Sequence, residues 1–293
     1  MTAPRILLAA HDLHPKKQYG QNFLVDPSTA RMIVDRTGLT PDDIVLEIGS
    51  GLGALTIPAA AQAKKVVAVE KDPEIVAVLE TELAARNIAN VALLNQDILT
   101  VDIPAISCRE GGKFIVLGNL PYNISSQIVI ALIRARQSID RAVLMFQKEV
   151  AQRLAVGPGS KDYGRLSVML QYCADVKKVA TVGPHLFLPK PKVASEVIEI
   201  RFKDTIIEPA ADERLLSAVV KAAFSTRRKT LKNALMNMEM NIPLDTIIRV
   251  LASAGIDPSR RAETLSVGEF VALSNRFYEA MRSAQAPHPS AGS

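Results

Sequence analysis

Four consecutive residues, Asn119-Leu120-Pro121-Tyr122, have the types needed to handle a weakly nucleophilic amine. The exocyclic amine of adenine is a poor nucleophile because its lone pair is delocalised into the ring. The side-chain oxygen of Asn119 and the backbone carbonyl of Leu120 can accept the two amine protons. Nitrogen then turns toward tetrahedral geometry and its lone pair points at an electrophile. No general base is needed before transfer, since the neutral amine can lose its proton afterwards. These residues are therefore predicted to form a catalytic loop.

The other two residues of the loop suit the same chemistry. Pro121 disfavours helical backbone at Leu120, which keeps the Leu120 carbonyl turned outward. Tyr122 offers a ring face on which an extruded base can stack. An isolated tetrapeptide of this kind is more often an ordinary turn after a strand. By itself it would also suit amines of cytosine or glutamine, so the interpretation depends on the residues before it.

A glycine-rich turn, Gly49-Ser50-Gly51-Leu52-Gly53, follows an apolar run. Glycines let the backbone turn sharply and let a ligand lie against it. Gly49, Gly51 and Ala54 also satisfy the looser pattern of dinucleotide enzymes, with Glu70 as the ribose-binding acid about 20 residues further on. A merely structural strand-to-helix turn is the third alternative.

Three acidic residues favour a nucleoside sulfonium over NAD in this turn. Glu47, two residues before the first glycine, would repel a pyrophosphate and attract a sulfonium. Glu70 can accept hydrogen bonds from both ribose hydroxyls, and Asp97 can accept one from an adenine amino group while Ile98 packs on the ring. A lone aspartate after a strand is more often a helix cap, so only the company of the other residues supports this role. The predicted cofactor is S-adenosylmethionine.

Alternating strands and helices must position these residues. Short β-branched runs predict strands at 44–48, 65–70, 91–95, 113–118 and 141–146. Helical patterns lie between them, one over 58–62 and one that Asp72 caps with Pro73 in its first position. Such alternation is typical of an α/β fold with a parallel sheet wound on both faces. Ligands of these sheets bind beyond the carboxyl ends of the strands, where the residues above fall.

The pattern changes after Arg201, because helical periodicity without strand-like runs extends from about Asp212 to Met281. We therefore expect a Rossmann-like S-adenosylmethionine methyltransferase domain followed by a small all-helical C-terminal domain. The predicted organisation is a flexible basic N-terminal segment at 1–24, the methyltransferase domain at 25–204, a helical RNA-binding domain at 205–282 and a disordered tail at 283–293.

Composition agrees with a soluble folded protein, since 48% of the 293 residues are hydrophobic and 22% are charged. The net charge of +5 permits a polyanionic partner without requiring one. Cys108 and Cys173 are far apart and the four histidines lack ligand spacing, so we expect reduced thiols and no metal. No run approaches the roughly 20 apolar residues of a membrane span. We expect no membrane contact and a cytoplasmic location.

With further segments, these motifs resemble the ribosomal RNA adenine dimethyltransferase family, most closely its bacterial members that act on small-subunit rRNA. The resemblance runs from about residue 16 to residue 273. The matching segments are 21–24, the glycine turn, 119–125, 147–151, 162–167, 187–195 and 224–231. So many matches in order make the resemblance specific.

The resemblance implies further residues and a substrate. Asn22 and Leu24 are implied to contact the cofactor, Phe187 to stack on the target adenine opposite Tyr122, and Ser125 to lie near that pocket. It also implies two methyl transfers to each of two adjacent adenosines in the 3′-terminal hairpin of 16S rRNA, with an immature 30S particle as partner. We expect a monomer. The expected cofactor contacts are Asn22, Leu24, Glu47, Gly49, Gly51, Glu70, Lys71, Asp97, Ile98 and Asn119.

Basic residues are candidate RNA contacts. The twelve residues 221–232 contain no acid, and at helical spacing positions 221, 228 and 232 share roughly one face. Such a stripe suits a phosphate backbone, although a basic run is usually just a solvated face. Residues 15–20 form a second basic segment beside the cofactor site. The candidates are Lys16, Lys17, Lys148, Lys221, Arg227, Arg228, Lys229 and Lys232.

Three other functions remain open. The first is an Erm-type enzyme that modifies one adenosine of large-subunit rRNA. The second is a ribosome-assembly factor that keeps the fold without catalysis, and the third is a nicotinamide oxidoreductase. Segments 162–167 and 224–231 favour the small-subunit enzyme, and the intact Asn119 and Tyr122 argue against lost chemistry. Calorimetry with S-adenosylhomocysteine and with NADH would separate a methyltransferase from a nicotinamide oxidoreductase, and we expect affinity only for S-adenosylhomocysteine.

Overall fold

The computed structural model describes residues 2–226, 228–240 and 242–285, which divide into two compact units. The first unit contains the described residues up to Ala155 together with Ala174–Asp204. The second contains Val156–Cys173 and the described residues from Thr205 onward. The sequence had placed 156–173 in the methyltransferase domain. The structure groups them with the helical unit because helix α8 (Arg165–Cys173) packs against two of its helices, α9 and α12.

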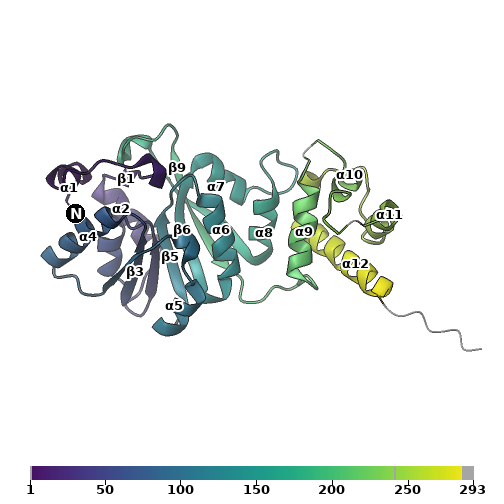
Figure 1. Ribbon diagram of the computed structural model, residues 1–293, viewed down its shortest axis with the longest axis horizontal. Coiled ribbons are helices and arrows are strands. Elements are labelled where there is room, and N and C mark those ends of the chain that lie inside the picture. The colour runs from purple at the N-terminus through teal and green to yellow at the C-terminus, as the bar shows by residue number, and fades with distance from the viewer. Residues whose placement is uncertain (1, 227, 241, 286–293) are drawn as a thin grey trace, which may run out of the picture. The chain divides into compact units, whose positions relative to one another are not determined.

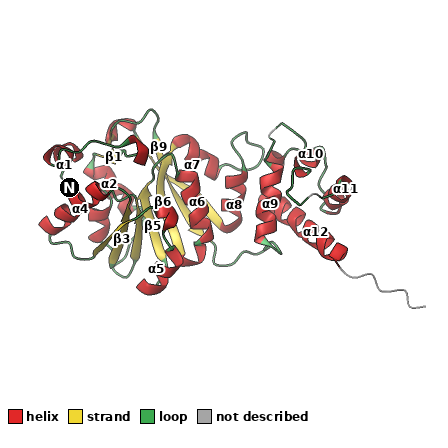
Figure 2. Cartoon of the chain, viewed as in Figure 1, coloured by secondary structure: helices red, strands yellow, loops and turns green. Residues whose placement is uncertain are grey.

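A mixed sheet of seven strands forms the centre of the first unit in the described part of the chain (Figure 1, Figure 2). Its strand order is β4-β3-β2-β5-β6-β9-β7. The strands are β2 Ile44–Ile48, β3 Lys65–Glu70, β4 Val91–Asn95, β5 Phe114–Asn119, β6 Ile139–Gln147, β7 Ala174–Val182 and β9 Ser195–Phe202. The five strands expected from the sequence run parallel, whereas β9 is antiparallel to both β6 and β7. The predicted Rossmann-like sheet is confirmed, and the antiparallel pair extends it.

Helices of the first unit connect the strands and cover the sheet. They are α2 Pro27–Asp35, α3 Thr56–Ala60, α4 Pro73–Ala85, α5 Ile103–Glu110, α6 Ser125–Arg134 and α7 Lys148–Ala155, with 3-10 turns η2 Ile98–Thr100, η3 Arg136–Ser138 and η4 Pro184–Leu186. Asp72 caps α4 by accepting from the Glu74 amide, as the sequence predicted. Val45, Leu117 and Val143, each fully buried at 0% exposure, carry the core across three neighbouring strands. Apolar β-branched strands thus hold the loops at their carboxyl ends.

The N-terminal segment contains defined elements where the sequence predicted a flexible stretch. Helix α1 (Pro4–Ala10), the 3-10 turn η1 (Lys17–Tyr19) and strand β1 (Phe23–Leu24) follow one another. Strand β1 pairs antiparallel with β8 (Phe187–Leu188), which places Leu24 opposite Phe187. Leu7 and Leu8 of α1 are buried in a cluster with residues of α4 and the glycine turn. Apolar packing therefore holds α1 against the first unit.

The second unit is helical throughout its described residues. Its elements are α8, α9 Glu213–Ala223, α10 Leu231–Leu235, α11 Leu244–Ser253, the 3-10 turn η5 Ala262–Thr264 and α12 Val267–Gln285. Its packing includes the ring of Phe224, which lies 6.2 Å from that of Tyr163 and 5.7 Å from that of Phe270. The predicted helical C-terminal domain is confirmed. The predicted disordered tail begins at 283, where α12 still continues, and from 286 it lies outside the described residues.

Gly118 in β5 lies where an added side chain would collide with β2. A Cβ there would stand 2.7 Å from the carbonyl oxygen of Ile48, an atom of the neighbouring strand that cannot move by itself. We expect Gly118→Ala to lower the free energy of unfolding in urea by about 1–3 kcal/mol. Gly112→Ala is the matched control, because its nearest neighbour is the flexible Ile44 side chain at 3.8 Å. Equal stabilities for the two variants would contradict the expectation.

Candidate active site

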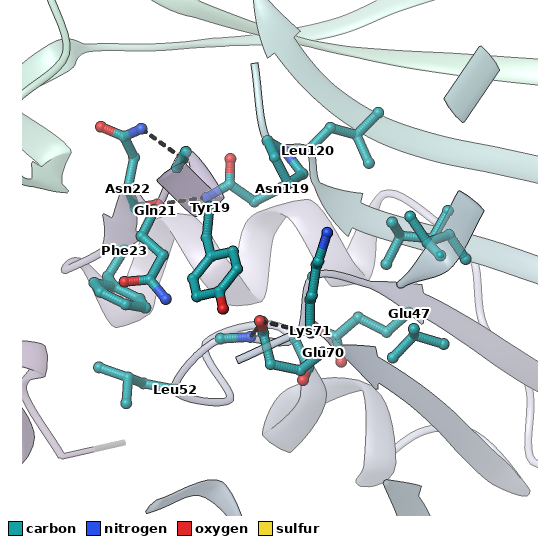
Figure 3. A pocket seen from close by; sticks show the side chains of 18 of the residues that line it. Tyr19, Gln21, Asn22, Phe23, Glu47, Leu52, Glu70, Lys71, Asn119 and Leu120 are labelled. Carbon is teal, nitrogen blue, oxygen red and sulfur yellow. Dashed lines mark hydrogen bonds between the residues drawn. The ribbon is translucent and has the colours of Figure 1, made fainter. Parts of the chain in front are cut away.

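One pocket of the first unit collects the residues that the sequence singled out for the cofactor (Figure 3). It lies at the carboxyl ends of β2, β3, β4 and β5. Leu120 and Pro121 of the catalytic loop also line it. The expected cofactor contacts on its wall are Asn22, Leu24, Glu47, Gly49, Gly51, Glu70, Lys71, Asp97, Ile98 and Asn119.

The glycine turn joins the cofactor side of this pocket to the catalytic loop. Gly49 and Gly51 have φ angles of +72° and +51°, in the left-handed region that favours glycine. A Cβ on Gly49 would lie 3.7 Å from the carbonyl oxygen of Asn119 and 3.8 Å from Cδ of Pro121. The turn therefore packs directly on the loop, and the two motifs act as one wall.

Glu70 ends β3 with its carboxylate already tied to the backbone. Oε2 accepts from the Gly51 amide at 3.0 Å, and Oε1 accepts from the amides of Lys71 and Asp72 at 2.8 and 3.0 Å. Burial nevertheless raises the pKa of Glu70. The sequence had left both oxygens entirely to the ribose. Since each carboxylate oxygen has two lone pairs, a sugar hydroxyl can add to these three bonds, but the orientation of the carboxylate is set by the turn.

Asp97 has two partners in the structure. Its Oδ1 accepts from the Leu99 amide at 3.0 Å, so Asp97 caps the 3-10 turn η2, and its Oδ2 pairs with Lys71 Nζ at 2.8 Å. The hydrogen bond from Lys71 holds the pKa of Asp97 below its usual value. Ile98 beside it is buried and lines the pocket. The cap role that the sequence weighed against a ligand role is thus present, and Asp97 still reaches the pocket wall.

Glu47 is the most deeply buried acid of the pocket, at 1% exposure. Its Oε2 and the hydroxyl of Ser50 have no hydrogen-bond partner among the described residues, although both residues line the pocket. Burial raises the pKa of Glu47 to about 8, which favours the protonated carboxyl near neutral pH. This differs from the standing negative charge assumed from the sequence. Buried acceptors without partners fit a cofactor that brings donors and positive charge, as S-adenosylmethionine does.

The side chain of Asn119 is oriented by the N-terminal segment. Its Nδ2 donates to the backbone carbonyl of Asn22 at 2.8 Å. With the amide nitrogen engaged in this way, Oδ1 is the end of the amide left to accept a hydrogen bond. The amide of Leu120 donates to the Met145 carbonyl at 3.2 Å, which holds the loop against β6. This geometry leaves Oδ1 free for the acceptor role of Asn119, which stays a prediction.

The two aromatic residues implied to hold the base differ in exposure. Tyr122 is half-buried, and its hydroxyl lies 2.9 Å from the hydroxyl of the fully buried Ser195 on β9. Phe187 is only 4% exposed and belongs to the core cluster that includes Leu24. Neither aromatic residue lines the cofactor pocket as the structure describes it. The stacking role of Phe187 therefore remains a prediction, and this arrangement buries its ring.

The bond between Tyr122 and Ser195 yields a prediction about ring placement. We expect Tyr122→Phe and Ser195→Ala each to slow methyl transfer by about three- to tenfold, because a neutral hydrogen bond contributes about 1 kcal/mol. The double variant should be no slower than either single one. Single-turnover assays at saturating cofactor measure this. Independent, multiplied losses would contradict a shared role of the two hydroxyls.

The candidate RNA residues are spread over both units, and their role stays a prediction. Lys17 and Lys148 are exposed on the first unit, and Arg228 and Lys229 on the second. Lys221 of the second unit pairs with Glu239 at 2.6 Å. Lys232 is partly exposed, and Arg227 lies outside the described residues.

The helical stripe through positions 221, 228 and 232 was wrong. Helix α9 ends at Ala223 and α10 begins at Leu231, so the three positions do not share one helix. The ring of Phe224 packs between Tyr163 and Phe270, and the Leu231 amide donates to the Arg260 carbonyl at 2.7 Å. These tertiary contacts replace the helical bonds that the periodicity suggested.

Several pocket residues escaped the sequence reasoning, and most belong to the N-terminal segment. Tyr19 and Gln21 lie beside Asn22 on the pocket wall (Figure 3). They precede the first strand of the large sheet, so no strand-end rule points to them. Two signals pointed to this stretch, namely the 21–24 motif that contains Gln21 and the basic segment 15–20 that was expected beside the cofactor site. Further residues missed in this segment are Thr2, Pro4, Gln18, Gly20 and Phe23.

Residues 2–226, 228–240 and 242–285 hold no group of three or more His, Cys, Asp or Glu side chains able to bind a metal ion. None of the helices in this same part of the chain has the length and apolar character to cross a membrane.

The profile of one protein family, described as "Ribosomal RNA adenine dimethylase", matches residues 13–279 of the sequence. The chain belongs to this family. As a ribosomal RNA adenine dimethylase, it is an enzyme that transfers methyl groups from S-adenosylmethionine to adenine in rRNA. The predicted family, activity and cofactor are confirmed.

Relatives and solved structures match over most of the chain. The sequence is 53% identical to "Ribosomal RNA small subunit methyltransferase A" of Desulforapulum autotrophicum, over 95% of this chain and 97% of the relative. A dimethyladenosine transferase from Plasmodium falciparum has a TM-score of 0.75 at 26% identity, covering 88% of this chain and 98% of its own. The 23S rRNA methyltransferase ErmE has a TM-score of 0.65 at 28% identity, covering 87% of this chain and 98% of its own. The dimethylase fold therefore extends over both units.

Proposed function

We propose that this dimethylase modifies the N6 amines of two adjacent adenosines in the 3′-terminal hairpin of small-subunit rRNA, with two methyl transfers to each. The observation that carries the proposal is the oriented amide of Asn119 at the wall of the cofactor pocket. The identity of 53% to an enzyme named for the small subunit supports the choice of substrate. We further propose that the enzyme acts as a cytoplasmic monomer on an immature 30S particle.

The chemistry follows from the groups around the pocket. Asn119 Oδ1 and the Leu120 carbonyl accept the two amine protons and aim the nitrogen lone pair at the cofactor. S-adenosylmethionine bound in this pocket would supply an electrophilic methyl group. The amine nitrogen would bond to this methyl group as its bond to sulfur breaks, and would then release a proton to solvent. Tyr122, held by Ser195, offers its ring to the extruded base.

Cofactor binding is assigned to the turns that end the strands. The Glu70 carboxylate, oriented by three backbone amides, accepts a hydrogen bond from a ribose hydroxyl. Ile98 packs on the adenine ring, and Asp97 lies at the edge of this ring. Oε2 of Glu47 and the hydroxyl of Ser50, which are buried and have no hydrogen-bond partner among the described residues, would face the methionine and sulfonium part. The exposed lysines and arginines of both units bind the RNA backbone, so activity should fall with rising salt.

A substrate comparison tests the proposal. Purified enzyme is incubated with immature 30S particles or with naked large-subunit rRNA, and the RNA is digested and analysed by mass spectrometry. We expect dimethyladenosine at two adjacent positions of the small-subunit hairpin. Methylation of the large-subunit RNA alone would identify an Erm-type enzyme instead, which the similarity to ErmE makes the natural rival. Analytical ultracentrifugation of the enzyme alone tests whether it is a monomer.

A further inference from the structure

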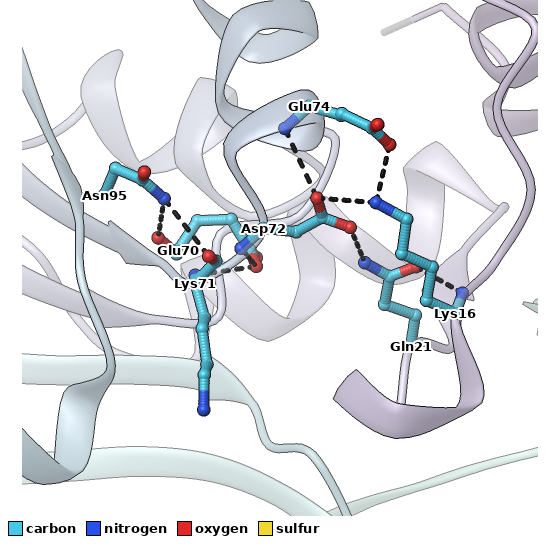
Figure 4. Close-up of polar contacts among 7 residues, drawn as sticks. All are labelled: Lys16, Gln21, Glu70, Lys71, Asp72, Glu74 and Asn95. Atoms are coloured by element: carbon cyan, nitrogen blue, oxygen red, sulfur yellow. Dashed lines mark hydrogen bonds and ion pairs between the residues drawn. The ribbon is translucent and has the colours of Figure 1, made fainter.

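Two side chains of the N-terminal segment hold a buried carboxylate at the edge of the cofactor pocket (Figure 4). Asp72 has 0% exposure; its Oδ2 accepts from Gln21 Nε2 at 2.8 Å and its Oδ1 from Lys16 Nζ at 3.0 Å. Lys16 Nζ also pairs with Glu74, and the Lys16 amide donates to Gln21 Oε1 at 2.7 Å. Lys16, Gln21, Asp72 and Glu74 form one closed network, which we call the latch.

The latch is built on the turn that carries Glu70. The amides of Lys71 and Asp72 both donate to Glu70 Oε1. Asp72 also caps α4, so its position is set by the helix and by the turn together. The carboxylate expected at the ribose and the carboxylate that holds the N-terminal segment therefore belong to the same rigid element.

From the latch, the segment runs over the pocket to the catalytic loop. Its residues 18–24 all line the pocket. Gly20, at φ +64°, comes so near the loop that a Cβ there would lie 2.9 Å from Asn123 Oδ1 and 3.4 Å from Pro121 Cβ. Two residues later, the carbonyl of Asn22 accepts from Asn119 Nδ2 at 2.8 Å. One short stretch of chain thus connects the latch to the amide that handles the substrate amine.

We propose that Lys16 and Gln21 are positioning residues, which close the N-terminal segment over the cofactor and thereby orient Asn119. With the latch closed, the Asn22 carbonyl fixes the Asn119 amide, and the N-terminal segment slows dissociation of the cofactor. With the latch open, the segment lifts, the amide loses its orienting partner and the cofactor is released. The proposal rests on the proposed function in one respect, namely that Asn119 receives the amine.

The two contacts to Asp72 differ in expected strength. Gln21 donates to a carboxylate that is almost fully buried, and a hydrogen bond to a buried charge is stronger than one at the surface. The ammonium of Lys16 contacts the same buried carboxylate, but the Lys16 side chain is 32% exposed and divides its bonds between Asp72 and the exposed Glu74, so solvent and salt weaken its hold on Asp72. Loss of Gln21 should therefore open the latch further than loss of Lys16.

This role differs from the RNA contact that the sequence suggested for Lys16. Its ammonium group is engaged with the carboxylates of Asp72 and Glu74, and these hydrogen bonds raise the pKa of Lys16. A lysine that serves as a latch affects the enzyme before any RNA is present. A lysine that serves only as a phosphate contact affects RNA binding alone. The two roles are therefore separable by a measurement without RNA.

The first experiment follows release of S-adenosylhomocysteine from the full-length protein by stopped-flow displacement without RNA. We expect Gln21→Leu, which removes both hydrogen bonds of the amide at similar size, to accelerate dissociation at least about tenfold. Lys16→Met should accelerate it about two- to fivefold, and less at high salt. Arg5→Met is the matched control. It removes a positive charge from an exposed position of α1 outside the latch, so its dissociation rate should equal that of the wild type.

The second experiment measures the methyl-transfer rate at saturating cofactor on immature 30S particles. Gln21→Leu should slow transfer in the wild-type background and cause no further loss in an Asn119→Ala background. A purely structural defect would multiply with the loss of Asn119. This double-mutant cycle therefore reports on the orienting role and not on general stability.

Each outcome bears on one part of the proposal. If S-adenosylhomocysteine dissociates from Gln21→Leu and Lys16→Met as slowly as from Arg5→Met, the latch is overturned. If the losses of transfer rate multiply in the double-mutant cycle, the link between the latch and Asn119 is overturned. If Gln21→Leu fails to fold, Lys16→Met at the surface carries the dissociation test. If the wild type leaves 30S particles unmodified while dissociation responds as expected, the latch stands and the proposed substrate fails.

Discussion

Asn119→Ala is expected to lower the rate of methyl transfer by about 10²–10³-fold, the loss that follows removal of one preorganised hydrogen-bonding group from a reaction centre. The variant removes the oxygen that accepts an amine proton and the nitrogen that bonds to Asn22. Substrate nitrogen then keeps its lone pair in the ring system. Single-turnover transfer from radiolabelled cofactor to 30S particles measures the effect.

Asn119→Asp is the informative companion variant. It keeps an acceptor but replaces the donor to the Asn22 carbonyl with a second oxygen, so the side chain can no longer bond there. We expect it to lose most of the activity as well, because orientation and acceptor chemistry are both required. Affinity for S-adenosylhomocysteine, measured by calorimetry, should change by less than about tenfold in either variant, since many other residues hold the cofactor. Unchanged transfer in Asn119→Ala would disprove the assigned role.

Glu47→Gln is expected to change how pH affects both stability and cofactor binding. Burial raises the pKa of Glu47 to about 8 in the folded chain, against 4.5 for the free side chain. Between these values the folded chain holds a proton that the unfolded chain has released. The contribution of Glu47 to stability is therefore fully present below pH 4.5 and declines as the pH rises through about 8. Glutamine does not titrate, so Glu47→Gln lacks this decline.

The measurable difference grows with pH. Relative to the wild type, Glu47→Gln should gain free energy of unfolding between pH 5 and pH 8, by an amount on the order of a few kcal/mol. Urea denaturation of the ligand-free protein at several pH values follows this trend. Parallel curves for the two proteins over this range would contradict the buried, neutral carboxyl.

Cofactor binding should reveal the same group. A positively charged sulfonium favours the ionised form of Glu47, so binding of S-adenosylmethionine at pH 7 should release up to about one proton. S-adenosylhomocysteine, which lacks the sulfonium charge, should release fewer. Calorimetry in buffers of different ionisation enthalpy counts these protons. Glu47→Gln should abolish the difference and reduce the preference for the charged cofactor about tenfold or more. Equal proton release by both proteins would place the sulfonium elsewhere.

Local patterns were enough for much of the fold and for the identity of the site. The five strands from Ile44–Ile48 to Ile139–Gln147 were predicted because five short β-branched runs alternate with helical patterns. The helix cap at Asp72 was predicted because a capping side chain forms its hydrogen bond within its own turn. Parallel strands end on one edge of the sheet, so Glu47, Glu70, Asp97 and Asn119 had to meet there. Their chemical types then selected the cofactor.

Contacts between distant segments decided the rest, and none of them follows from spacing. The basic stripe was wrong because the Phe224 ring packs on Phe270 and the Leu231 amide donates to the Arg260 carbonyl. These contacts with residues far along the chain override a helical preference worth tenths of a kcal/mol per residue. The antiparallel strands β7 and β9 were missed because their pairing depends on partners more than on composition. The pairing of Phe187 with Leu24, which buries the Phe187 ring, was not predicted either, and the stacking role of Phe187 remains a prediction.

The amine-handling loop shows the same division between sequence and structure. Its residue types alone predicted an acceptor pair, because the inventory of donors and acceptors is a local property of each side chain. Only the tertiary structure decided which end of the Asn119 amide is engaged, because its nitrogen donates to the carbonyl of Asn22, a residue 97 positions earlier in the chain. It likewise decided that burial raises the pKa of Glu47 and that Lys16 faces carboxylates, because burial and long-range contacts act on charge and orientation.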